Sequence, residues 1–570
     1  MPLPKKPENI VNKMRIIGDN TFLEAFIKMK YLILFLIPII YSPGCIREND
    51  KNKGKTVFRY NEAANITSLD PAFARDQANI WPAHQLFNGL AELNEKAELI
   101  PCIAKTWNIS KNGLEYIFHL RNDVVFHDSP AFKGGKGRKV IASDFVFSFS
   151  RIADQKNESP GSWIFNNVEQ KNSIYSFEAP DDSTFLIRLQ KPYPPFLGLL
   201  TTLYCSVVPQ EAVGYYAENF RKNPVGTGPF QFKMWKEGVK LVFVKNPRYF
   251  EFENGRRLPC LDAVAISFLP DKQSAFLEFT KGNLDFISGI DPDYKDELLT
   301  MEGKLNPKFT GKFQLITQPY LNTEYLGFLV DSNSLVVRNN PVRLKNIRKA
   351  INYAFDRNKM IRFLRNNIGT PGINGIIPKG MPSFDSNSVY YEYNPGKARM
   401  LLADAGFPDG TGLPPIVLST TADYLDLCKY IQHEVSETGI NMKIDITPPA
   451  AIKEMKAQAK LPFFRASWIA DYPDAESYLS LFYSRNFCPQ GPNYTHFSSK
   501  VFDNLYEKAM AEVDDSIRFQ YYHQMERLIM ENSPVVILYY DQVLRFVQKN
   551  VKGLGSDPMN LLTLKRVRKE

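Results

Sequence analysis

The stretch from Arg465 to Asp471 carries the residue types best suited to ligand chemistry. It reads Arg-Ala-Ser-Trp-Ile-Ala-Asp, so an apolar, aromatic run holds a cation at one end and an anion at the other. In an extended chain, at ~3.3 Å per residue, the two charges would lie roughly 20 Å apart on the same side, because their spacing is even. An extended ligand with a cationic and an anionic end could span much of that gap. The alternative is a core strand whose end charges form structural ion pairs.

Signatures of catalysis are absent from the sequence. It contains no GxSxG nucleophile elbow, no HExxH zinc motif and no GxxxxGK[ST] phosphate loop. Its six histidines are dispersed along the chain, and we interpret them as structural or surface residues. The sequence therefore predicts no catalytic residue, no metal site and no cofactor.

Composition limits the class of protein. The 570 residues have ordinary globular proportions, with 44% hydrophobic and 23% charged residues. That length allows two to four domains. A net charge of +9 is small for the length and indicates no nucleic-acid partner.

The N-terminal region resembles an export signal. Tyr31–Tyr41 is an uncharged apolar run after Lys28 and Lys30, and it leads through Ser42-Pro43-Gly44 to Cys45. The run is too short for a comfortable transmembrane helix and fits the hydrophobic region of a signal peptide. With Cys45 following Gly44, the segment 1–45 resembles a bacterial lipoprotein signal, in which the cysteine is lipidated. A plain cleaved signal or an uncleaved anchor is the alternative. Met29 is a natural start for such a signal, and the polar residues 46–55 are typical of a tether.

The remaining chain must position the Arg465–Asp471 stretch, and its patterns predict a mixed α/β protein with more than one lobe. Alternating apolar residues predict strands over 114–120, 184–189 and 239–244, and a short run predicts another over 535–540. The glycine-rich segment Asn223–Phe230 is typical of a hairpin turn. Two apolar stripes at helical spacing predict helices: Leu344, Ile347, Ile351, Ala354 and Phe355, and then Ile517, Tyr521, Met525 and Leu528, ended by Asn532-Ser533-Pro534. Lobes joined by several short crossings suggest a hinge.

Several blocks in order resemble the family 5 extracellular solute-binding proteins of ABC importers, the oligopeptide- and dipeptide-binding proteins. The resemblance runs from about Lys55 to the C-terminus, and its most informative block is Asn112–Asp128, which includes Phe118-His119-Leu120-Arg121. The other blocks are Ser68–Pro71, Phe87–Leu90, Pro101–Trp107, Ala142–Phe149, Pro224–Phe230, Asn246–Tyr249, Lys281–Asp285, Ile347–Ile351 and Ala470–Pro473.

The resemblance implies a periplasmic-binding-protein-like fold of type II, cluster C, with three lobes and a hinged ligand cleft. Domain I would comprise 56–87, 209–318 and 536–570, domain II 88–208, and domain III 319–535. A peptide would lie extended between domains I and III, bonded like an added strand.

Site residues follow from the same resemblance. Asp471 would pair with the ligand's α-ammonium group, and Arg465 would help neutralise its carboxylate end. Ser467 and Ile469 would offer backbone groups to the ligand. The remaining residues that the resemblance places at the ligand are Trp468, Tyr472, Asp76, Gln77 and Trp163.

The resemblance implies a binding protein and not an enzyme. We expect a lipid-anchored monomer, exported by the general secretory route to the periplasm or outer envelope. It would capture small peptides and deliver them to the permease and ATPase of an ABC importer. The alternatives are an envelope peptide hydrolase and a surface chaperone or adhesive lipoprotein that uses the same cleft.

Overall fold

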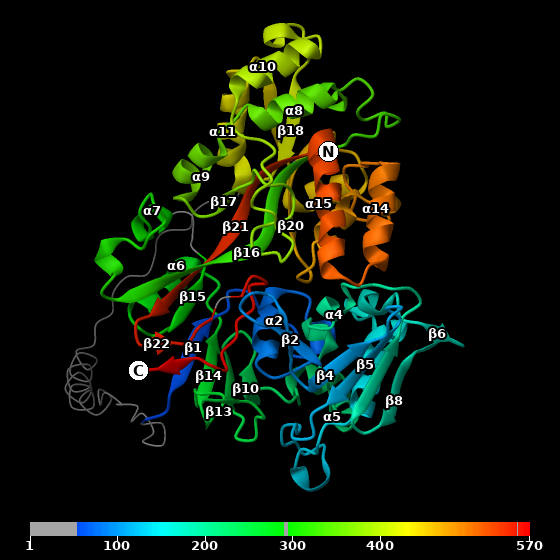
Figure 1. Cartoon of the computed structure of the whole chain (residues 1–570). Helices are drawn as coiled ribbons and strands as arrows, with labels where there is room; N and C mark the ends of the chain where they lie inside the picture. The colour runs from blue at the N-terminus through cyan, green and yellow to red at the C-terminus, as the bar shows by residue number, and fades with distance from the viewer. Residues whose placement is uncertain (1–53, 290–293, 556) are drawn as a thin grey trace, which may run out of the picture. The chain divides into compact units, whose positions relative to one another are not determined.

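A large mixed sheet runs through the folded part of the chain (Figure 1). The computed structural model describes residues 54–289, 294–555 and 557–570. The predicted signal, Cys45 and residues 46–53 of the tether lie outside the described residues. The strand order is β10 (Phe230–Lys236), β11 (Lys240–Lys245), β14 (Ala263–Ser267), β1 (Val57–Asn61), β15 (Phe286–Ser288), β21 (Val535–Gln548), β16 (Phe313–Phe328), β20 (Phe463–Ile469), β18 (Ile416–Thr420) and β19 (Met442–Ile446), and β17 (Thr370–Pro371) pairs with β21.

Two long antiparallel strands, β16 and β21, join the two halves of this sheet. They pair from Phe313 opposite Gln548 to Gly327 opposite Val535, with a register shift between Pro319 and Thr323. Near Gly327 the pair is buried on both faces, because alternate side chains enter two different cores. Leu326 and Phe328 pack into one core, and Tyr325 packs into the other.

A four-stranded antiparallel sheet forms a separate layer. Its order is β4 (Ala104–Ile109), β5 (Glu115–Leu120), β9 (Thr184–Arg188) and β8 (Phe177–Asp181). Helix α3 (Ala142–Ala153) packs on it through Phe145 and Phe149, whose rings contact Phe185. The strands predicted over 114–120, 184–189 and 239–244 are thus confirmed within one residue at either end, as β5, β9 and β11.

Short elements complete the fold. The paired strands are β2 (Ala91–Leu93) with β3 (Leu99–Pro101), β6 (Gln170–Lys171) with β7 (Ile174–Tyr175), β12 (Phe252–Glu253) with β13 (Arg256–Arg257), and β22 (Val551–Lys552) with β23 (Arg568–Lys569). The other helices are α2 (Gln77–His84), α4 (Phe196–Leu199), α5 (Gln210–Tyr216), α6 (Lys272–Thr280), α7 (Lys295–Leu298), α8 (Lys345–Tyr353), α9 (Arg357–Arg365), α10 (Pro395–Asp404), α11 (Leu425–Ser436), α12 (Pro449–Ala457), α13 (Glu476–Leu479), α14 (Lys500–Ala511) and α15 (Asp515–Asn532). Across these described ranges, no helix has the length and apolar character needed to cross a bilayer.

Both predicted helices form, but the buried face of α15 differs from the predicted stripe. Met525 is buried, whereas Ile517 is 42% exposed. The buried face includes Arg518 and Tyr522 in its place, because both reach Asp474 from this helix. Tyr521, Met525 and Leu528 of the predicted stripe pack in or against the core, so the prediction is wrong only at Ile517. A buried polar network at Asp474 occupies the core-facing side near that end of the helix.

The glycine-rich segment Asn223–Phe230 is not a hairpin turn, as the sequence had suggested. It follows a 3₁₀ helix and enters β10 as an irregular segment packed against the backbone at Leu86. The Gly228 N–H donates to the Leu86 carbonyl at 2.9 Å. A Cβ atom at Gly226 would lie 2.1 Å from that same carbonyl oxygen. The close approach of two backbones therefore requires glycine here.

Candidate functional site

A cavity of about 620 Å³ lies at the end of β20. One wall comes from N-terminal segments, namely α2 and the loops that hold Trp163 and Tyr204. The opposite wall is Ile469, Ala470 and Asp471, which close β20. Residues about 300 to 400 positions apart in sequence thus face one another across a single space.

Asp471 presents a carboxylate to this cavity without a protein partner. Within the described residues, no side chain or backbone group donates a hydrogen bond or forms an ion pair with its carboxylate oxygens. Solvent reaches the side chain, yet the surrounding cavity walls desolvate it and raise its pKa above the ordinary value. The carboxylate is unpaired and only partly desolvated, so a cationic ligand group could reach it and would be stabilised by its negative charge.

The opposite wall holds the predicted residues Gln77 and Trp163. Gln77 begins α2 and accepts a hydrogen bond from the Asn560 side chain at 3.2 Å. Trp163 lies in a 3₁₀ turn and is 40% exposed. Asp76 does not line the cavity; it caps α2 by accepting from the Asn79 N–H at 3.1 Å.

Several residues that line the cavity are not predicted from the sequence, although the sequence holds a signal for some of them. Ile80, Trp81 and His84 follow Gln77 at helical spacing, and all four line the cavity. Residues three, four and seven apart share one helix face, so predicting Gln77 as a ligand contact also predicts these three residues. Tyr204, Tyr320 and Asn560 carry no such signal, because distant segments bring them here.

One edge of β20 is largely unpaired. Its pairing with β16 covers Phe463 to Ile469, whereas its pairing with β18 is limited to Phe464 opposite Ser419. The Ala470 N–H donates to the Leu321 carbonyl of β16. Since backbone groups alternate along a strand, the peptide groups of Ser467 and Ile469 turn toward the other, open edge. An extended ligand could bond to them as an added strand.

Arg465, at the start of the stretch, is engaged by the protein itself. Its guanidinium group forms an ion pair with Glu324, and the two side chains are only 13% and 4% exposed. The Tyr424 ring covers it, with 3.2 Å between the guanidinium carbon and the ring centroid. The sequence left open whether these end charges bind a ligand or form structural ion pairs. Arg465 forms a structural ion pair, whereas Asp471 forms none with the described residues.

Trp468 and Tyr472 serve packing and are not part of the cavity wall. The Trp468 indole donates to the Ser477 hydroxyl at 3.2 Å and packs against the core of this half. Tyr472 is buried in the core formed by the N-terminal half and donates to the Glu476 carboxylate. Its hydroxyl also lies 3.1 Å from that of Tyr193.

A second cavity of about 640 Å³ adjoins the first one, since both are lined by Tyr320 and Asn560. Its walls include Arg365, Tyr424 and Asp541. The site is thus a cleft with two arms: the Asp471 arm, defined by the first cavity, and the Arg365 arm, defined by the second.

The comparisons with known proteins identify the family. A family model described as "Bacterial extracellular solute-binding proteins, family 5 Middle" matches residues 98–487. The chain belongs to this family. It is similar to the dipeptide-binding protein of Escherichia coli (strain K12), at 26% identity over 83% of this chain and 87% of that protein. It is also similar to heme-binding protein A of Haemophilus influenzae, at 28% identity over 89% and 91%.

A solved structure supports the fold. The periplasmic binding protein DppA from Helicobacter pylori, in complex with the peptide STSA, aligns with a TM-score of 0.70 at 24% identity, over 91% of this chain and 99% of that one. The predicted mixed α/β fold of the type II periplasmic-binding-protein class is confirmed. Because the family consists of solute-binding proteins, the chain is a binding protein and not an enzyme, and it is extracytoplasmic.

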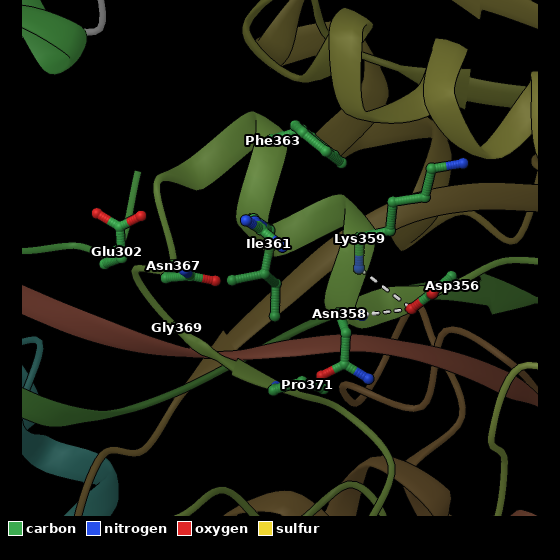
Figure 2. Close-up of a pocket in the computed structure, with 10 residues that line it drawn as sticks. Glu302, Asp356, Asn358, Lys359, Ile361, Phe363, Asn367, Gly369 and Pro371 are labelled. Atoms are coloured by element: carbon green, nitrogen blue, oxygen red, sulfur yellow. Dashed lines mark hydrogen bonds between the residues drawn. The ribbon is translucent and has the colours of Figure 1, made fainter. Parts of the chain in front are cut away.

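Another cavity of this solute-binding protein, shown in Figure 2, lies beside the Arg365 arm, because α9 and the loop after it contribute residues to both. It has a volume of about 510 Å³ and is lined by residues of α9 together with Glu302, Asn367, Gly369 and Pro371. Asp356 caps α9 at this place by accepting from the backbone N–H groups of Asn358 and Lys359. None of the residues predicted for ligand binding lines it.

Within the part of the chain that the structure describes, one group of side chains has the composition of a metal site. The ligand atoms of Glu92, Cys102 and Glu251 lie within 4.8 Å of one another. However, the Lys565 ammonium group bonds to Glu92 at 2.7 Å and to Glu251 at 2.9 Å. The lysine supplies the cation that this acidic group needs, so we assign the cluster a structural role.

Proposed function

We propose that this protein captures short peptides in its cleft and delivers them to an ABC-type peptide importer. The observation that carries the proposal is the unpartnered Asp471 carboxylate beside the open edge of β20. Backbone hydrogen bonds at such an edge would recognise the main chain of the ligand, which is the same in all peptides whatever their side chains. The carboxylate would fix the position of the ligand's α-ammonium group.

The relatives support a peptide ligand. One is named for dipeptide binding, and one solved structure holds the peptide STSA. Another relative is named for heme binding, so membership in the family does not by itself select the ligand. What favours a peptide here is the local chemistry of an anionic end point next to free backbone donors and acceptors.

We propose a hinge where β16 and β21 pass between the halves of the large sheet. The register shift between Pro319 and Thr323 lies opposite Asp541, and a β-bulge bends a strand locally.

The same register shift supports a boundary between domains I and III at 318/319. Since Val535–Tyr540 pairs with the domain III half of β16, the last part of domain I would begin near Asp541. Residues 56–87 and 209–318 would complete domain I, and 88–208 would form domain II.

Calorimetric titration with alanine peptides of two to five residues tests the function. We expect at least one length to bind in the micromolar range or tighter, and to be recovered intact afterwards. Small-angle scattering of the saturated sample should then show a smaller radius of gyration, because the lobes close on the ligand. The absence of binding at every length by a folded protein would contradict the proposal, and recovery of cleaved peptide would favour a hydrolase.

We also propose that Cys45 carries a lipid that anchors the protein to the cell envelope. The support is the sequence alone, an apolar run that leads through Ser42-Pro43-Gly44 to Cys45. Cys45→Ser is expected to move most of the protein from the membrane fraction to the soluble envelope fraction. Cys260→Ser, which changes a cysteine far from the signal, is the control and should leave the distribution unchanged. A Cys45→Ser protein that still sediments with membranes would show that lipidation does not hold it there.

A further inference from the structure

A peptide held by its ammonium group at Asp471 has a carboxylate at its other end, and that charge needs a partner in the cleft. Arg465 is the candidate from the sequence, but the structure places it out of reach. Its charge is paired with Glu324 and its outer face lies under the Tyr424 ring. Its Nε atom is buried and has no hydrogen-bond partner among the described residues. A ligand carboxylate would have to displace both neighbours to reach this guanidinium group.

We propose that Arg365, and not Arg465, receives the C-terminal carboxylate of the ligand. Arg365 is the last residue of α9 and lines the Arg365 arm of the cleft. Its side chain is 26% exposed, twice the exposed fraction of Arg465. This inference rests on the proposed peptide ligand, because it assigns the second charged end of that ligand.

The guanidinium group of Arg365 is held in place while part of it stays free. Its Nε–H donates to the Ile368 carbonyl at 3.0 Å, one Nη to the Tyr539 hydroxyl at 2.9 Å and the other to Asp541 at 2.6 Å. The Tyr539 ring lies 4.1 Å from its central carbon. A guanidinium group carries five N–H donors, so one remains on each Nη atom. A carboxylate would add to these donors without breaking the existing bonds.

Arg365 forms an ion pair with Asp541, and other donors also engage that carboxylate. The Asp541 carboxylate is shared, because it also accepts from the Gln542 N–H at 2.9 Å and the Asn322 side chain at 3.3 Å. Lys295 adds a positive charge to this arm, while Asp423 and Asp426 line its rim with negative charge. Arg365 thus supplies a positive charge held in place inside an arm that also carries acidic residues, so a carboxylate is stabilised there only where it bonds directly to the guanidinium group.

Because the two arms adjoin, one peptide could reach both Asp471 and Arg365. Tyr320 lines both arms and comes from the irregular part of β16, where the strand faces Asp541 on one side and Ala470 on the other. A peptide along the open edge of β20 would leave its ammonium group at Asp471 and direct its other end toward Tyr424 and Arg365. The ligand class is therefore a short peptide with both termini free, and C-terminal amides are selected against.

A cycle with blocked peptides tests this assignment. The alanine peptide that binds the wild type best is compared with its C-terminal amide by calorimetry. We expect amidation to weaken binding to the wild type by about 10- to 100-fold, the effect of a hydrogen bond to a charged group. Arg365→Met combined with Asp541→Asn, which leaves no carboxylate unpaired, should bind both forms within threefold of each other. Arg362→Met, on an exposed part of the same helix, should keep the wild-type difference.

The outcomes separate this inference from the proposed function. Free peptides that bind while amidation has no effect would overturn the assignment of Arg365 alone. A difference that survives in the double variant and is lost in Arg465→Lys would return the role to Arg465. If no peptide binds, the proposed function itself fails.

Discussion

Asp471→Asn is expected to lower the affinity for a short peptide by roughly 30- to several-thousand-fold. The substitution keeps the shape of the side chain and removes its charge. The ammonium group of the ligand would then be buried without its partner, which costs about 2–5 kcal/mol. Calorimetry with the best alanine peptide measures the loss. Circular dichroism should show an unchanged fold, because no described residue depends on this carboxylate for a hydrogen bond.

An N-acetylated peptide provides the control for this prediction. Acetylation removes the ammonium charge from the ligand, so it should weaken binding to the wild type as much as the mutation does. On Asp471→Asn the further loss should be small, because both changes remove the same pair. Equal binding of free and acetylated peptides by the wild type would overturn the role of Asp471 and weaken the peptide proposal with it.

Because the pKa of Asp471 is raised, the affinity of Asp471 for the ligand's ammonium group should depend on pH. Ammonium binding requires the ionised carboxylate, so affinity should fall on acidification at pH values above the ordinary aspartate pKa of 3.8. Folding responds in the opposite sense. Because the folded-state pKa is raised, this group favours the folded protein most at acid pH, and that contribution is lost as the pH rises through the folded pKa. The fall in affinity is therefore not unfolding caused by Asp471, and Asp471→Asn should show no such dependence.

Arg465→Ala is expected to lower the free energy of unfolding by about 3–5 kcal/mol, the usual cost of removing one partner of a buried ion pair. It would leave the Glu324 carboxylate, only 4% exposed, without its cation. Urea denaturation followed by tryptophan fluorescence measures the change. Arg465→Met with Glu324→Met should recover much of the loss, because no unpaired charge then remains buried.

An exposed ion pair provides the matched control. Arg566 pairs with Glu253, and their side chains are 45% and 41% exposed. Arg566→Ala should cost less than about 1 kcal/mol, since water already solvates both charges. If Arg465→Ala costs no more than this control, the pair with Glu324 is not structural. Arg465 would then be available to a ligand.

The sequence by itself determined the local elements and one face of the site. Alternating residues predicted β5, β9 and β11, because a half-buried strand exposes every second side chain to the core. The same alternation placed Arg465, Ser467 and Ile469 on one side of β20, opposite Phe464 and Ala466, which pack into a core. It also marked Asp471 as the polar end point of an apolar run. These properties depend only on neighbours within a few residues along the chain.

Tertiary structure alone decided which charges are free. Glu324 is 141 residues from Arg465 in sequence, and Arg365 reaches the cleft only because α9 packs beside β21. Tyr472 was predicted to contact the ligand, yet it is buried against Tyr193, which lies 279 residues away. A spacing pattern cannot specify such partners, because the packing of distant segments brings them together. That packing leaves Asp471 without a protein partner among the described residues and pairs Arg465 with Glu324.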